Sequence, residues 1–164
     1  ICFTRVAEII IEGGLHNFLR RRKMKKKLHC LKNHYIVCGY GRMGSIVSER
    51  LEEEKYPFVI IENNEEKIEN IRKNKKYLFI NGDAAHEEEL NNAGIKKAKA
   101  MAALLPSDAD NLYLVLTAKL INPSLFILSK AMDEEAERKI LQVGANKVVS
   151  PYKLCGLKIA QALI

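Results

Sequence analysis

Short apolar runs alternate with amphipathic stretches along the chain from residue 34 onward. Runs with almost no polar alternation are typical of strands buried on both faces of a sheet, and they cover residues 35–38, 58–61, 77–80, 101–105, 125–128 and 147–149. Between them, helical spacing or capping residues predict helices over 42–55, 64–74, 107–121 and 133–143, a short one before Gly94 and a last one from Pro151. This order predicts a doubly wound (Rossmann-like) α/β fold with a six-stranded parallel sheet and a C-terminal crossover helix.

Two of the predicted helices begin at recognisable capping residues. Asn64 precedes two glutamates, and Ser107 with Asp110 has the spacing of a capping box. In the long helix that follows Ser107, we expect four apolar residues to face the core: Leu112, Tyr113, Leu116 and Leu120.

A glycine-rich segment directly follows the first strand and opens the first helix. It reads Gly39-Tyr40-Gly41-Arg42-Met43-Gly44. Gly39 permits a tight turn, Gly41 lets the backbone approach a pyrophosphate, and Gly44 lets the helix press on the strand. The N–H groups and dipole of the helix start then hold phosphate. The alternative is a tight turn without a ligand, and Arg42 either contacts phosphate or stays solvated.

A carboxylate stands at the end of the second strand. Glu62 lies 23 residues beyond Gly39, where an acid accepts hydrogen bonds from the ribose hydroxyls of a nucleotide. An acid there repels a 2′-phosphate. The sequence therefore favours NAD(H), or AMP, ADP or ATP, over NADP.

The charge of the chain is concentrated in its leader. The net charge is +7, and residues 1–34 hold nine of the basic and two of the acidic side chains, which leaves the remainder neutral. Residues 1–15 are mostly apolar, and seven cations follow within 20–27. This order is typical of the cytoplasmic end of a membrane helix, and a solvated tail is the alternative. A nucleic-acid partner is not expected, because no aromatic residues interleave with the cations.

The sequence gives little support for disorder, disulfide bonds, catalysis or metal binding. A hydrophobic fraction of 48% excludes disorder. The four cysteines have no paired spacing, which fits a reducing cytoplasm. We expect no catalytic residue and no metal site, because no nucleophile has a base beside it and His29, Cys30, His34 and Cys38 match no zinc pattern.

Several motifs together resemble the RCK domains (regulators of potassium conductance, also called KTN or TrkA-N domains). They are residues 34–44, 81–84, 105–111, 143–146 and 148–151. The resemblance implies three parts: the end of a pore-lining helix and a basic linker over 1–33, a nucleotide-binding lobe over 34–150, and a crossover helix that begins at 151. A C-terminal lobe is not included in this chain.

The resemblance also implies a function. It implies a sensor at the cytoplasmic face of the cell membrane that binds a nucleotide and gates a potassium pore of the same polypeptide. The linker would lie near anionic lipid. The last helix would pair two copies of the chain into a dimer, and such dimers would build an octameric ring. The alternative is the cofactor half of an NAD-dependent oxidoreductase, although little chain remains for a substrate domain.

One position departs from the calcium-gated members of this family. Asp83 is present after the third strand, but Lys130 and Met132 stand where those members place acids. A cation in that cleft opposes Ca²⁺ and favours phosphate. Asp83 and Lys130 are therefore included with the glycine segment and Glu62 as candidate cofactor-binding residues.

Overall fold

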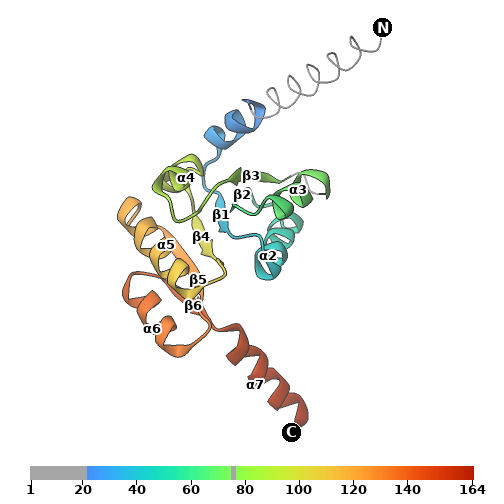
Figure 1. Cartoon of the computed structure of the whole chain (residues 1–164), viewed down its shortest axis with the longest axis vertical. Coiled ribbons are helices and arrows are strands. Elements are labelled where there is room, and N and C mark those ends of the chain that lie inside the picture. Colours follow the sequence, from blue (N-terminus) through green and yellow to red (C-terminus); the bar gives the residue numbers. More distant parts are fainter. Residues whose placement is uncertain (1–21, 75–76) are drawn as a thin grey trace.

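A computed structural model describes residues 22–74 and 77–164 and contains one parallel sheet (Figure 1). The strand order is β3-β2-β1-β4-β5-β6, and every neighbouring pair is parallel. The strands are β1 (Tyr35–Cys38), β2 (Phe58–Glu62), β3 (Leu78–Asn81), β4 (Ala100–Ala103), β5 (Phe126–Lys130) and β6 (Lys147–Val149). The predicted six-stranded doubly wound fold is confirmed, and the predicted strand boundaries agree with the structure to within two residues.

Helices connect successive strands, and a last helix follows β6, as the alternation predicts. They are α2 (Arg42–Glu53), α3 (Glu65–Asn74), α4 (Glu87–Asn92), α5 (Asp108–Ile121), α6 (Glu134–Gln142) and α7 (Pro151–Leu163). A short 3₁₀ turn, η1 (Ile95–Lys97), follows α4 and was not predicted. Both predicted caps are confirmed: Ser107 Oγ accepts from the Asp110 N–H at 3.1 Å, and Asn64 Oδ1 accepts from the Lys67 N–H at 3.0 Å.

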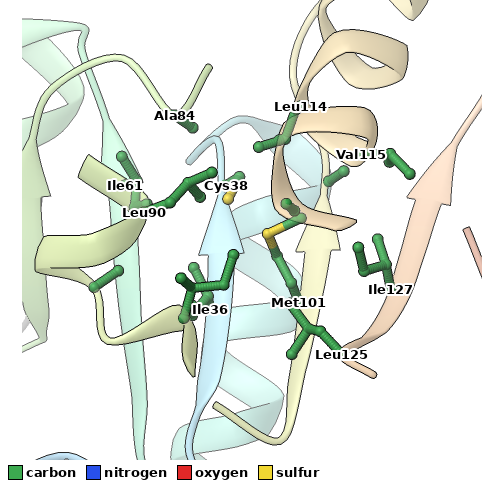
Figure 2. Packing of buried hydrophobic residues seen from close by; sticks show 14 of the residues in the cluster. Ile36, Cys38, Ile61, Ala84, Leu90, Met101, Leu114, Val115, Leu125 and Ile127 are labelled. Atoms are coloured by element: carbon green, nitrogen blue, oxygen red, sulfur yellow. The ribbon is translucent and has the colours of Figure 1, made fainter. Parts of the chain in front are cut away.

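Two hydrophobic clusters lie on opposite faces of the sheet. Alternate residues of β1 divide between them, because successive strand side chains point to opposite faces: Ile36 and Cys38 join one cluster and Val37 the other. The first cluster includes residues of α4, α5 and α6, and Figure 2 shows Leu90, Leu114 and Val115 within it. The second includes residues of α2 and α3. Helices therefore pack on both faces of the sheet.

The prediction that four residues of α5 face the core is wrong for three of them. Tyr113, Leu116 and Leu120 are 55%, 40% and 72% exposed. The residues that pack on the sheet are Leu114, Val115 and Ala118, and Leu112 is partly buried beside them. The cause is that α5 is apolar over most of its circumference, so periodicity alone does not identify its buried face.

A helix over residues 22–30 packs against the edge of this domain. Met24 contacts the α2–α3 cluster, whereas Leu28 contacts the cluster on the other face. The expected inner-helix end over 1–15 and part of the basic run lie outside the described residues. Within the described ranges, no helix combines the length and apolar character that crossing a membrane requires.

Helix α2 lies so close to β1 that one position excludes a side chain. A Cβ at Gly44 would overlap the backbone carbonyl oxygen of Gly39, and Gly44 is itself buried. Because the obstacle is backbone, rotation of a side chain does not relieve the overlap. This close approach fixes where the first turn of α2 meets the end of β1.

We predict that Gly44→Ala lowers the free energy of unfolding by about 1–3 kcal/mol, because the added methyl overpacks the helix–strand contact. Urea unfolding of both proteins measures this difference. Gly156→Ala is the matched control, since a Cβ there meets open space and alanine favours the helix. An unchanged midpoint for Gly44→Ala would contradict the proposed constraint.

Candidate nucleotide-binding site

A cavity of about 770 Å³ opens beyond the carboxyl ends of the central strands. This edge is where the strand order reverses between β1 and β4, which is the usual ligand site of open parallel sheets. Its size suits a nucleotide-sized ligand. The walls come from the glycine segment, the ends of β2, β4 and β5, and the first turns of α3 and α7.

The glycine segment has the geometry of a phosphate loop. Gly39 has φ +96°, a conformation that favours glycine, and a Cβ there would lie 2.9 Å from the Leu104 carbonyl oxygen. At Gly41 a Cβ would meet nothing within 4 Å, so the backbone of this residue faces open space. Among the described residues, no side chain caps α2 and no acid lies in its first turn. The positive end of the α2 dipole is therefore available to an anion.

Glu62 is the most constrained polar group of the site. Its side chain is 5% exposed. One carboxylate oxygen accepts from the backbone N–H of Tyr40 at 2.7 Å, and the other accepts from the N–H groups of Asn63 and Asn64 at 3.0 and 2.9 Å. The Lys67 ammonium lies 3.4 Å from the first oxygen.

These contacts decide the charge of Glu62. Burial by itself raises the pKa of the carboxyl group, but hydrogen bonds from Tyr40, Asn64 and Asn63 and the charge of Lys67 lower it, and the net pKa is below the ordinary value. Glu62 is therefore an anion at neutral pH, able to accept hydrogen bonds from ribose hydroxyls.

The structure brings most of the predicted residues together. Seven of the nine line the cavity: Gly39, Gly41, Arg42, Met43, Glu62, Asp83 and Lys130. The other two act behind it. Gly44 makes the helix–strand contact, and Tyr40 supplies its backbone N–H to Glu62 while its ring lies 6.4 Å from that of Tyr77, centroid to centroid. That these nine residues bind a cofactor stays a prediction.

Asp83 and Lys130 place opposite charges around the same cavity. Asp83 Oδ1 accepts from the Ala85 N–H at 2.9 Å and so holds the turn after β3. Lys130 ends β5 and lines the cavity with Met132. Asp108 at the start of α5 accepts from the Met132 N–H at 2.9 Å, which fixes the loop that follows Lys130.

The lining residues that were not predicted include Lys67, Tyr152 and Cys155. Lys67 is the third residue of α3, so the Asn64 cap places it beside Glu62. Tyr152 and Cys155 belong to the first turns of α7, which starts immediately after β6 at the carboxyl edge of the sheet. In each case the signal was a helix start that follows a strand at this edge.

A second cavity, also of about 770 Å³, lies between the helix over 22–30 and the elements α3, β3 and α4. Several of its charges are already paired, since Glu69 lies 3.4 Å from both Arg72 and Lys73. It also lacks a phosphate loop. The first cavity is therefore the better candidate for nucleotide binding.

The fold, the glycine segment and the acid at the end of β2 define a domain of the Rossmann class. The model of the TrkA-N domain family matches residues 35–151. The chain belongs to this family, and the predicted resemblance to RCK domains is confirmed.

Two relatives from Methanocaldococcus jannaschii match almost the whole chain. A probable potassium channel protein 2 is 49% identical over 164 residues, which is 99% of this chain and 48% of the relative. A potassium channel protein 1 is 38% identical over 160 residues, which is 97% of this chain and again 48% of the relative. The chain thus spans about half the length of these relatives.

Solved structures share the fold. The TrkA-N domain of the inner membrane protein YbaL from Escherichia coli superposes with a TM-score of 0.78 at 27% identity, covering 82% of this chain and 99% of that one. A GsuK channel bound to NAD superposes with a TM-score of 0.68 at 19% identity, covering 87% of this chain and 27% of that one. A Kef C-terminal domain from Shewanella denitrificans with bound AMP superposes with a TM-score of 0.70 at 24% identity, covering 80% of this chain and 79% of that one.

We predict that Glu62→Gln lowers the free energy of unfolding at pH 7 by about 1–3 kcal/mol, since an amide NH₂ then faces backbone donors. Folding lowers the pKa of Glu62, so its stabilisation is present above the ordinary value of 4.5. That stabilisation is lost as the pH falls through the lowered pKa. The difference between the two proteins should therefore shrink below about pH 4.5.

Urea unfolding across this pH range measures the difference. Glu66→Gln, at an exposed acid in the first turn of α3, is the matched control and should change stability little. A difference that is independent of pH would argue against a charged, hydrogen-bonded Glu62.

Proposed function

We propose that this chain is the cytoplasmic regulatory domain of a potassium channel and that it responds to NAD(H) or to an adenine nucleotide. The observation that carries the proposal is one cavity that combines the phosphate loop at Gly39–Gly44 with the anionic Glu62. Channel names of two relatives over nearly the whole chain favour this role over the cofactor half of an oxidoreductase.

Different parts of the cavity would bind different parts of the nucleotide. The phosphates would lie on the N–H groups at the start of α2, near Gly41 and Arg42, and Glu62 would accept from the adenosine ribose. Lys130 and Asp83 would then face the distal part of a dinucleotide, or further phosphates of a mononucleotide. Related domains bound to NAD, ADP and AMP support this ligand class.

The linker role follows from how the helix over 22–30 sits on the domain. Met24 and Leu28 contact the two hydrophobic clusters, while Arg22, Lys23 and Lys26 are exposed. We propose that residues 1–33 join a membrane pore to this sensor, with the exposed cations toward anionic lipid. Because the helix over 22–30 packs against the sheet edge, a movement of the domain would be transmitted to the linker.

We predict that Gly41→Asp abolishes nucleotide binding and preserves the fold. The added side chain occupies the space of the pyrophosphate and repels it, whereas the open space around Gly41 leaves the fold undisturbed. Calorimetric titration with NADH and with ADP should show an affinity loss of about a hundredfold or more. Ile46→Asp, which adds the same charge at an exposed position of α2, should bind like the original protein.

The cysteines supply a second readout of the same binding event. Cys155 is exposed and lines the cavity, whereas Cys30 is exposed on the helix over 22–30 and absent from the cavity wall. Saturating NADH or ADP should slow alkylation of Cys155 and leave Cys30 unchanged, as measured by mass spectrometry of the two peptides. Equal affinity in Gly41→Asp together with an unprotected Cys155 would refute the site.

We also propose that α7 pairs two copies of the chain, as the first contact of a larger ring. No residue of α7 is buried, and Leu157, Ile159 and Leu163 are 57%, 62% and 83% exposed. An exposed apolar helix of this kind is a typical self-association surface.

The prediction is a dimer in solution that the pair Ile159→Glu and Leu163→Glu weakens about a hundredfold, through loss of apolar burial. Light scattering across a concentration series measures the change. Lys158→Glu with Gln161→Glu adds two acids at polar positions of the same helix and should leave the dimer intact. If the unsubstituted protein is monomeric at tens of micromolar, this pairing is ruled out.

A further inference from the structure

The ribose end of the cavity contains a cation as well as an acid. Glu62 has four contacts, and the three from backbone N–H groups measure 2.7–3.0 Å. The fourth, from Lys67 Nζ, is the longest at 3.4 Å. It is also the contact made by a mobile type of side chain, so it is the one that a ligand displaces most easily.

The fold holds Lys67 at this position. Its backbone N–H is bound by the Asn64 cap at 3.0 Å, and its side chain is 38% exposed and lines the cavity. The neighbouring acid Glu65 is engaged elsewhere, since it accepts from Asn81 Nδ2 at 3.0 Å and lies 3.4 Å from Arg72. Lys67 is therefore the cation available to a group that sits beside Glu62.

This arrangement changes the electrostatic expectation drawn from Glu62 alone. A buried carboxylate without a counter-charge repels a 2′-phosphate, which is the basis for preferring NAD(H). An ammonium 3.4 Å from that carboxylate offsets the repulsion. It also offers the phosphate a direct charged contact in a partly desolvated setting.

Building on the proposed function, we propose that Lys67 is a specificity-determining residue of the ribose end. It allows the pocket to accept adenine nucleotides that carry a 2′-phosphate as well as those without one. A free ribose hydroxyl donates to Glu62 in place of the Lys67 ammonium. The released ammonium then pairs with the 2′-phosphate where the nucleotide carries one.

The test compares the dissociation constants of NADPH and NADH for the whole chain by calorimetry at one fixed ionic strength. We expect NADPH to bind within about tenfold of NADH, and Lys67→Gln to raise the NADPH-to-NADH ratio by about tenfold. Lys67→Arg keeps the charge and should retain the original ratio.

Lys73→Gln is the matched control. It removes the same charge from the same helix, at a residue that lies 3.4 Å from Glu69 and lines the other cavity, so the ratio should not change. An unchanged ratio in Lys67→Gln, or a more than hundredfold preference for NADH in the original protein, would overturn the role of Lys67 and leave the nucleotide site standing. Failure of NADH, NADPH and ADP alike to bind would overturn both proposals.

Discussion

The carboxylate of Glu62 holds the candidate site together. It accepts hydrogen bonds from the backbone of the phosphate loop at Tyr40 and from the backbone after β2 at Asn63 and Asn64. One side chain therefore joins the β1–α2 and β2–α3 connections. Because the group is buried and charged, loss of any of these donors leaves an anion that is costly to desolvate. The loop that would hold phosphate is thus positioned by the same residue that would hold ribose.

This double use limits how a nucleotide can bind. Two carboxylate oxygens offer about four acceptor positions, and the structure shows four donors around Glu62. A ribose hydroxyl therefore competes with an existing contact. Displacement of a backbone N–H would loosen the phosphate loop, whereas displacement of Lys67 leaves the loop in place. Binding and loop stability are compatible only along the second route.

The sequence predicts the parts of this structure that depend on short-range constraints. Strand runs, the caps at Asn64 and Ser107, and the turn at Gly39 each follow from a few neighbouring residues. The buried face of α5 was missed because apolar residues surround that helix. Tyr152 was missed because its place depends on how α7 meets the other elements at one sheet edge, which spacing along the chain does not encode. Lys67 was missed although its place is local, since the predicted Asn64 cap sets it beside Glu62.

Helix α7 begins at this same edge of the sheet. Its first turns contribute Tyr152 and Cys155 to the cavity, while none of its residues is buried. Figure 1 shows α7 extending away from the sheet. The Lys153–Glu134 pair at 2.7 Å is exposed and holds the helix weakly. A ligand of the size of this cavity would contact both the phosphate loop and this loosely attached helix, so occupancy of the proposed site would restrict the direction of α7.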